Sequence, residues 1–200
     1  MRDVTGSGLN KTRPGLDPGP QGQGRGPGSG PGQGGFILRT DRLVLRDAGA
    51  GDVDAVHATL ASDWDVVRFT GSWVWPPDRD FTASRCQPIP PKQGLGGVVT
   101  RDGDIIGMAS IFGEAELGYM LARDHWGQGY ATEICRALVA AGFASGRYAR
   151  LQACVFDDNP GSARVLRKLG FEEGAACIGH CASRKADLPT RNFTLSAPQA

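Results

Sequence analysis

Hydrophobic residues along the chain recur with two different periods, and the period of each run predicts the element that it forms. Leu43 and Leu45 alternate with Val44 and Arg46, a strand pattern with one buried face. Val53, Val56 and Leu60 recur at i, i+3 and i+7, the spacing of one helix face. Further apolar runs that predict strands cover 97–101, 104–112, 117–121, 151–156 and 191–195.

The segments between these runs predict how the strands connect. Asp102-Gly103 lies between two apolar runs, which is a strong signal for a hairpin of antiparallel strands. Segment 133–143 reads as a helix between strands 117–121 and 151–156, which makes a βαβ crossover. The pattern predicts an α+β fold, a mixed and mostly antiparallel central sheet with a βαβ crossover in its middle and flanking helices.

A further helix is predicted after strand 151–156, because its end signals are present in order. Asn159 is a good N-cap and Pro160 suits the first helical position. Gly170 suits the position just beyond a helix end.

Segment 62–95 is the least regular part of the chain. Its prolines exclude a central strand and predict loops. Trp73 and Trp75 lie within it, and two interpretations of them stand. They line the rim of an acceptor site, or they pack as lids over the core, which is the interpretation we favour.

Composition separates the first 35 residues from the rest. Twelve of them are glycine and five are proline, so this segment cannot bury enough apolar surface to offset its backbone entropy. We expect residues 1–35 to be a disordered tail and 36–200 to form one folded domain. Arg13 and Arg25 among the glycines leave an RNA-binding tail as the less favoured alternative.

Charge and hydropathy exclude several classes of function. The net charge of +1 gives no basic field for nucleic acid, and no apolar run reaches the length of a membrane span. No secretory signal stands at the N-terminus. Five cysteines, an odd number in mostly apolar contexts, fit a reducing cytoplasm better than a disulfide framework. We therefore expect a cytoplasmic protein, a monomer or a homodimer, with neither nucleic acid nor membrane as partner.

The strongest chemical signal is the stretch 126–132, between strand 117–121 and helix 133–143. A strand, a glycine-containing turn and a helix place free backbone N–H groups at a helix N-terminus, which favours phosphate. Gly127 and Gly129 lack Cβ atoms, so the main chain can approach a phosphate closely. The stretch predicts a pyrophosphate cradle.

Two common nucleotide motifs do not fit this stretch. It lacks the third glycine of a dinucleotide fingerprint, and antiparallel strands precede it. No Gly-Lys-Ser/Thr follows, which excludes a P-loop. The sequence Cys177-Ile-Gly-His-Cys181 offers only three candidate ligands, so we expect strand or loop residues there and no metal site.

Four motifs in register resemble a known family. They are Thr40-Asp-Arg-Leu-Val-Leu-Arg46, Glu116-Leu-Gly-Tyr119, Trp126-Gly-Gln-Gly-Tyr-Ala-Thr-Glu133, and Asn159-x-x-Ser162 with Lys168-Leu-Gly-Phe171. Together they resemble the GCN5-related N-acetyltransferase (GNAT) superfamily, and within it the RimJ/RimL-type branch of ribosomal-protein N-terminal acetyltransferases. The resemblance implies the GNAT fold, acetyl-CoA as co-substrate and an amine as acceptor.

The resemblance also implies which residues hold the coenzyme. The main chain around Tyr119, Met120 and Leu121 would bond the pantetheine arm and polarise the thioester carbonyl. Asn159 would face the coenzyme as well as cap its helix. The cradle residues implied to bind are Trp126, Gly127, Gln128, Gly129, Tyr130, Ala131 and Thr132, with the pyrophosphate on the N–H groups of Gln128, Gly129, Ala131 and Thr132.

Three side chains are implied in catalysis: Glu116, Asn159 and Ser162. Glu116 is the best-placed carboxylate to take the proton of the amine, with Glu114 next, and the alternative for each is a solvated carboxylate at a strand end. Ser162 would lie near the sulfur. Many superfamily members have a tyrosine four residues after this serine as the acid toward the thiolate, whereas this chain has Leu166. The thiolate is then protonated by Ser162, by water or not at all.

The acceptor follows only from the resemblance. It implies an N-terminal amine of a ribosomal or other protein, with a small amine or an antibiotic as the alternative. A catalytically silent domain that binds acyl-CoA as a sensor is the alternative of another class. His57 on the first helix is read as a surface or half-buried residue and not as a base.

Overall fold

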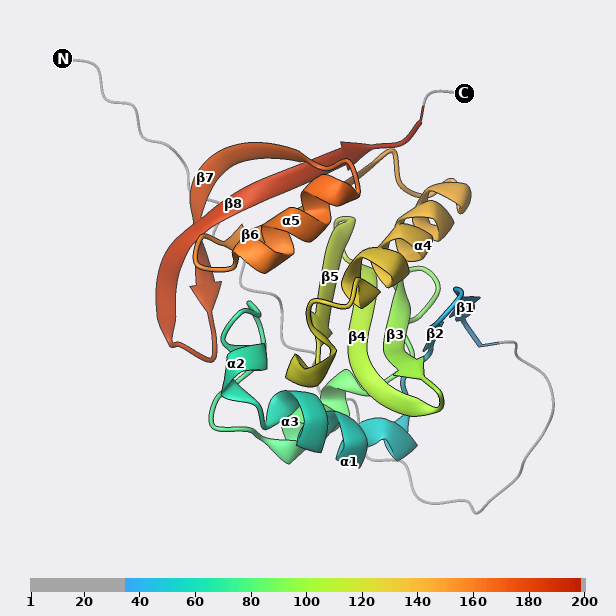
Figure 1. The fold of residues 1–200 in the computed structure, drawn as a ribbon, viewed down its shortest axis with the longest axis vertical. Coiled ribbons are helices and arrows are strands. Elements are labelled where there is room, and N and C mark those ends of the chain that lie inside the picture. Colours follow the sequence, from blue (N-terminus) through green and yellow to red (C-terminus); the bar gives the residue numbers. More distant parts are fainter. Residues whose placement is uncertain (1–34, 199–200) are drawn as a thin grey trace. The chain divides into compact units, whose positions relative to one another are not determined.

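The computed structural model describes residues 35–198, so all but the last residue of the segment 1–35 lies outside the described residues. Within them, eight strands form one sheet in the order β1-β2-β3-β4-β5-β6-β8-β7 (Figure 1). The strands are β1 (Ile37–Arg39), β2 (Val44–Arg46), β3 (Gly94–Arg101), β4 (Asp104–Phe112), β5 (Glu116–Leu121), β6 (Arg150–Phe156), β7 (Glu172–Cys181) and β8 (Ala186–Ser196).

Five α-helices accompany the sheet, and none in the described part is long and apolar enough to cross a membrane. They are α1 (Val53–Val56), α2 (Trp64–Val67), α3 (Arg79–Arg85), α4 (Tyr130–Ala144) and α5 (Pro160–Lys168). A π-helical segment, η2 (His57–Ala61), continues α1, and short 3-10 turns are η1 (Ala50–Asp52) and η3 (Arg123–His125).

The predicted hairpin and crossover are both present. Asp102 and Gly103 have φ of 53° and 98° and join β3 to β4, as the paired positive φ of a tight hairpin turn requires. Helix α4 connects β5 to β6, which is the parallel pair of the sheet, and the other neighbours are antiparallel. The predicted α+β architecture is confirmed.

Strands β5 and β6 pair only where the crossover brings them together. Their register holds a single residue pair, Glu116 with Gln152, near the amino end of β5. Beyond it the two strands separate toward their carboxyl ends (Figure 1). In an open α/β arrangement ligands bind outside the carboxyl ends of the strands, so this divergence marks a place for one.

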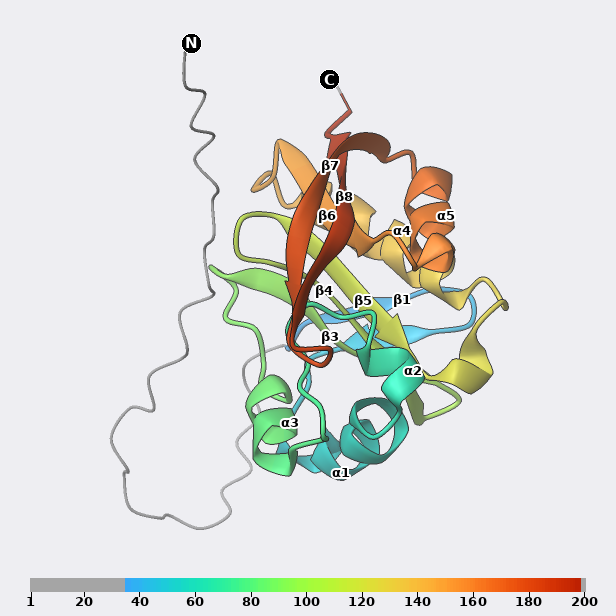
Figure 2. The same cartoon turned by 90° about the vertical axis from the view of Figure 1, so that its left-hand side faces the viewer.

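Both faces of the sheet are covered, as adjacent residues of β3 show. Val98 is fully buried against the cluster of α1, η2 and α2, whereas Val99 is fully buried against the cluster of α4 and α5. Successive side chains of a strand point to opposite faces, so α1–α3 lie on one face and α4–α5 on the other (Figure 2). The predicted helix stripe Val53, Val56 and Leu60 is buried on the α1 face.

The prediction of loops throughout 62–95 is wrong, because two short helices form there. The carboxylate of Asp63 accepts the amide of Asp65 at 2.9 Å, and that of Asp78 accepts the amide of Phe81 at 2.9 Å, so each helix has an N-cap. Trp73 is 6% exposed and packs edge-on against Phe81, with ring centroids 5.7 Å apart. Trp73 therefore packs in the core, as the favoured interpretation expected.

The last hairpin is longer than the sequence predicts. Only 191–195 was expected as a strand, yet β7 and β8 span ten and eleven residues. The connection between them lies against the end of α2 and the segment that follows it. The Ser183 hydroxyl donates to the carbonyl of Val67, the last residue of α2, at 3.1 Å. The amide of Ala182 donates to the Gly71 carbonyl at 3.0 Å.

Candidate active site

The predicted cradle lies at the N-terminus of α4, which begins at Tyr130, three residues earlier than expected. Gly129 is the N-cap with a left-handed φ of 83°, and Gly127 has a φ of 73°. Side chains adopt such conformations at a cost, so both positions favour glycine. The first-turn N–H groups of a helix have no intrahelical partner, which leaves those after Gly129 free to face a ligand.

Side chains fix the loop that leads into the cradle. The indole nitrogen of Trp126 donates to the Leu121 carbonyl at 2.8 Å. The side-chain Nε2 of Gln128 donates to the Asp124 carbonyl at 2.8 Å. Trp126 is 43% exposed, so its ring also forms part of the surface beside the loop. The loop is therefore held at both ends before any ligand arrives.

A distant pair ties the first turn of α4 to the start of the sheet. Glu133 accepts from the Thr40 hydroxyl at 2.6 Å, and from the Arg42 amide at 3.0 Å and Nε at 2.7 Å. Arg42 also donates from Nη1 to the Gln128 carbonyl at 3.2 Å. Burial opposes ionisation of Glu133, but these hydrogen bonds outweigh it and hold its pKa below the usual range.

Sequence reasoning missed Arg42 and Thr40 as parts of the site. Both lie in the motif 40–46 that contributed to the family resemblance, 91 and 93 residues from Glu133. The Thr-Asp-Arg sequence indicates a turn, but it does not predict that these residues contact Glu133. Arg42 further lies over the Tyr130 ring, 4.4 Å from its centroid.

A cavity of about 180 Å³ adjoins the cradle. Arg164 and Lys168 of α5 form its opposite wall, four residues apart on one helix face. Both side chains are exposed, and neither has an ion pair among residues 35–198. These two cations suit an anionic ligand. Their i, i+4 spacing on the predicted helix was visible in the sequence, but it was not used to predict this wall.

The residues that line this cavity come from the end of β5, the cradle and α5. They are Leu121, His125, Gly127, Gly129, Tyr130, Ala131, Thr132, Gly161, Arg164, Val165 and Lys168. Of the predicted coenzyme-binding residues, the structure thus brings five of the cradle residues and Leu121 around one cavity.

The main chain of β5 presents its groups to two different neighbours. The amide of Ala122 donates to the Ile106 carbonyl of β4 at 2.8 Å, so the backbone of Met120, two residues earlier, faces β4 as well. The backbone of Tyr119 and Leu121 then faces β6, where no pairing with β6 is present. Trp126 occupies the Leu121 carbonyl, so the main-chain groups of Tyr119 and the N–H of Leu121 remain on this side.

Asn159, Ser162 and Tyr119 come together across the diverging strands. Asn159 Oδ1 accepts the amide of Ser162 at 3.0 Å, which is the predicted N-cap of α5. The Tyr119 hydroxyl lies 2.8 Å from Ser162 Oγ and 3.2 Å from the Ser162 carbonyl. Burial raises the pKa of Tyr119 well above its usual value. Leu166, four residues after Ser162, is fully buried in the core.

Glu116 lies apart from this group, on the other face of β5. It is exposed at the amino end of the strand, opposite Gln152 of β6. It lies three positions before Tyr119, and residues three positions apart in a strand point to opposite faces. Glu116 thus lies on the α1–α3 face, at the end where β5 and β6 are still paired, whereas the hydroxyl pair lies on the α4–α5 face.

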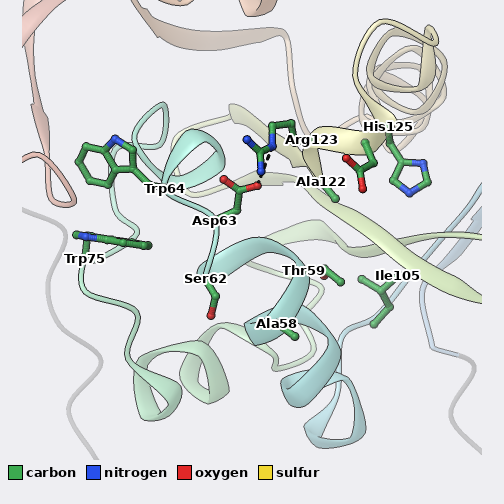
Figure 3. Close-up of a pocket in the computed structure, with 11 residues that line it drawn as sticks. Ala58, Thr59, Ser62, Asp63, Trp64, Trp75, Ile105, Ala122, Arg123 and His125 are labelled. Atoms are coloured by element: carbon green, nitrogen blue, oxygen red, sulfur yellow. Dashed lines mark ion pairs between the residues drawn. The ribbon is translucent and has the colours of Figure 1, made fainter.

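A second cavity, of about 540 Å³, lies on the α1–α3 face (Figure 3). Trp64 and Trp75 form one wall, edge to face with centroids 5.4 Å apart. Asp63 and Arg123 line it as an ion pair with 3.3 Å between Nε and Oδ2. His125 lines this cavity and the cradle cavity, so the two share one wall.

Other candidates from the sequence fall outside the site. His57 is half-buried and bonds the Thr82 hydroxyl at 3.0 Å, as expected for a structural residue. Cys177 bonds Thr190, His180 bonds Asp187, and Cys181 is buried against α2. No group of three or more His, Cys, Asp or Glu in residues 35–198 is placed to hold a metal ion.

The chain is similar in sequence to known proteins over most of its length. Residues 42–172 match the acetyltransferase (GNAT) domain family. The uncharacterized N-acetyltransferase YoaA of Bacillus subtilis (strain 168) is 33% identical over 182 residues, which cover 82% of this chain and 98% of YoaA.

Two solved structures share the fold at low sequence identity. RimL, a ribosomal L7/L12 alpha-N-protein acetyltransferase in complex with coenzyme A, aligns with a TM-score of 0.69 at 16% identity, over 80% of this chain and 98% of RimL. An acetyl transferase of Salmonella typhimurium that modifies the N-terminal serine of ribosomal protein L7/L12 aligns with a TM-score of 0.69 at 16% identity, over 82% of this chain and 100% of that one.

These matches confirm the family and the fold that the four motifs implied. The matched region runs from the turn before β2 to the start of β7, and it contains the cradle, the crossover and α5. Acetyltransferases of this family use acetyl-CoA. The chain belongs to the GNAT family of acetyltransferases.

Proposed function

We propose that this enzyme transfers the acetyl group of acetyl-CoA to the N-terminal α-amine of a protein. The observation that carries the proposal is a pair of cavities on opposite faces of one sheet, which share His125 as a wall. Both lie beside the carboxyl end of β5, and no residue of β6 lines either of them. A donor can enter from the α4–α5 face and an acceptor from the α1–α3 face.

The donor side suits the pyrophosphate and pantetheine of the coenzyme. Free N–H groups of the first turn of α4, with Gly129 as N-cap, would hold the pyrophosphate. Arg164 and Lys168 would add charge from the opposite wall. The open main-chain groups of Tyr119 would bond the pantetheine and polarise the thioester carbonyl, as a strand edge does for an added strand.

The chemistry needs a base, an oxyanion donor and a route for the thiolate. Glu116, directly or through water, would take a proton from the attacking ammonium on the acceptor face. The main chain of Tyr119 would donate to the oxyanion that forms on the carbonyl. Ser162, on the donor face, would stabilise the departing thiolate, whose solution pKa near 8.5 makes it a good leaving group.

The acceptor cavity has room for the N-terminal residue of a protein, and equally for a drug-sized amine. Its volume of about 540 Å³ lies in the range of sites that hold drug-sized ligands. Two structural relatives are named for action on ribosomal protein L7/L12. A ribosomal acceptor would place the reaction in the cytoplasm.

A direct test mixes the enzyme with acetyl-CoA and a panel of acceptors, with free thiol as the readout. The panel contains peptides with free N-termini, the same peptides blocked by N-terminal formylation, and small polyamines. Thiol release with free but not blocked peptides supports the proposal. Release only with polyamines assigns a small-molecule enzyme, and coenzyme binding without release from any amine assigns a sensor.

A further inference from the structure

The side chains of Tyr119 and Ser162 form a contact that the proposed main-chain binding of the donor does not need. Tyr119 belongs to β5 and Ser162 to the first turn of α5, so their hydroxyls join the strand to the helix next to Leu121 and Gly161, which line the donor cavity. The phenol oxygen lies 2.8 Å from Ser162 Oγ and 3.2 Å from the Ser162 carbonyl. A single side chain therefore contacts two acceptor atoms of one residue.

The number of protons in this group limits its arrangements to two. Tyr119 and Ser162 carry one hydroxyl proton each. In the first, Ser162 donates to the phenol oxygen while Tyr119 donates to the Ser162 carbonyl, and both protons are used inside the pair. In the second, Tyr119 donates to Ser162 Oγ, which leaves the Ser162 proton free for a third acceptor.

The phenol remains a donor throughout the working pH range. Burial is the main cause that raises the pKa of Tyr119, and the hydrogen bond of Ser162 offsets it only partly. A proton does not pass from Tyr119 to a thiolate whose pKa is far lower. Tyr119 can thus orient a neighbouring hydroxyl but cannot act as the acid.

We propose that Tyr119 is a positioning residue that directs the Ser162 hydroxyl to the sulfur of coenzyme A. This inference rests on the proposed function. As the amine nitrogen bonds to the carbonyl carbon and the C–S bond breaks, the electron pair of that bond goes to sulfur. Tyr119 turns its proton from the Ser162 carbonyl to Ser162 Oγ, and Ser162 donates a hydrogen bond to the thiolate. Both hydroxyls keep their protons.

The phenol that contacts Ser162 comes from β5 and not from α5. Leu166 stands where many superfamily members have a tyrosine, and its side chain is fully buried. It offers no donor to the cleft. Tyr119 supplies a phenol from the facing wall, with Ser162 between it and the sulfur.

The test is single-turnover acetyl transfer to a peptide acceptor by four proteins: wild type, Tyr119→Phe, Ser162→Ala and the double variant. Tyr119→Phe keeps the ring and should slow transfer roughly tenfold, as expected for one lost hydrogen bond in the transition state. The KM for acetyl-CoA should change less than about twofold, since the main chain of residue 119 is retained. Because Tyr119 acts through Ser162, the double variant should be no slower than Ser162→Ala.

Tyr148 provides the matched control. It is 8% exposed and its buried hydroxyl has no hydrogen-bond partner in the described part of the chain. Tyr148→Phe should leave the transfer rate unchanged, and thermal melts should show that all variants are folded.

The outcomes separate this inference from the proposed function. An unchanged rate in Tyr119→Phe, or a double variant slower by the product of the two single effects, would overturn the positioning role while wild-type turnover still supports the enzyme. A wild-type protein that releases no thiol with any acceptor would overturn both.

Discussion

The indole nitrogen of Trp126 donates a 2.8 Å hydrogen bond to the main-chain carbonyl of Leu121. The bond closes the loop between β5 and α4 onto the last residue of β5. It occupies the Leu121 carbonyl, whereas the Leu121 N–H stays on the side of the donor cleft. We therefore expect the pantetheine to bond the main chain of Tyr119 and the Leu121 N–H, and the loop to be ordered before the coenzyme binds.

Trp126→Phe tests whether this preorganisation matters. The variant keeps an aromatic ring but loses the donor, so the loop should order only when the coenzyme binds. We expect a rise of roughly three- to tenfold in the KM for acetyl-CoA with little change in kcat, the cost of about one hydrogen bond. Initial rates against acetyl-CoA concentration measure it. Trp64→Phe, which changes a tryptophan that is 37% exposed and lines the other cavity, should leave this KM unchanged.

The cationic wall of α5 gives a prediction about salt. Lys168→Met and Arg164→Met should each raise the KM for acetyl-CoA several-fold at low ionic strength, by roughly the strength of a charge-assisted contact. The effect should shrink as salt screens exposed charges. Arg167→Met is the matched control, because Arg167 pairs with Glu173 and does not line the cavity. A salt-independent loss, or an equal loss in Arg167→Met, would count against phosphate contact.

The base is tested by paired glutamine variants. Glu116→Gln should lower kcat by roughly 10²-fold or more, within the range that general bases contribute, and leave the KM for acetyl-CoA near wild type. Glu114→Gln, at the other candidate carboxylate, should be nearly neutral. Rate profiles between acid and alkaline pH check both. An unchanged kcat for Glu116→Gln across that range would remove Glu116 from the mechanism, and a loss confined to Glu114→Gln would move the role there.

A pair away from the site predicts how stability depends on pH. Arg46 donates to both carboxylate oxygens of Asp52 at 2.8 and 2.7 Å, and this pairing holds the pKa of Asp52 below its usual value. A depressed folded pKa means that Asp52 stabilises the fold above the unfolded value, near pH 4, and loses this contribution as pH falls through the folded pKa.

Asp52→Asn should therefore lower the melting temperature at pH 7, by roughly 1 kcal/mol of unfolding free energy since Arg46 is partly exposed, and the difference from wild type should shrink as pH falls toward 2. Asp54→Asn removes a fully exposed partner of Arg79 and should change little at either pH. Thermal melts from pH 2 to 7 measure both. A constant difference between wild type and Asp52→Asn over that range would show that the pair does not titrate as described.

The sequence predicted the parts of the fold that depend on local periodicity. The β3–β4 hairpin follows from Asp102-Gly103 between apolar runs, and α5 follows from Asn159, Pro160 and Gly170. Each of these signals acts through residues that are neighbours in the chain. The βαβ crossover could be read in the same way, because helix and strand periods alternate there.

The remainder depends on contacts between distant segments. Helices α2 and α3 have four and seven residues, too short for a helical period to stand out among prolines, and they are held by caps and by Trp73 packing on Phe81. The pairs Arg42–Glu133 and Tyr119–Ser162 join residues far apart in the sequence. Motif spacing places such residues in one family but does not say which side chains meet.

The central claim is that the cradle at α4 holds coenzyme A, and calorimetric titration with coenzyme A tests it most directly. Wild type should bind one coenzyme per chain. Gly129→Val places a branched side chain at a φ of 83° beside Arg42, whereas Gly146→Val imposes a similar strain at a φ of 67° at the far end of α4. Binding at least tenfold weaker in Gly129→Val, with Gly146→Val like wild type, is the predicted result, since the proposed phosphate site adjoins Gly129 and not Gly146. Equal binding by Gly129→Val and wild type, or no binding by wild type, would contradict it.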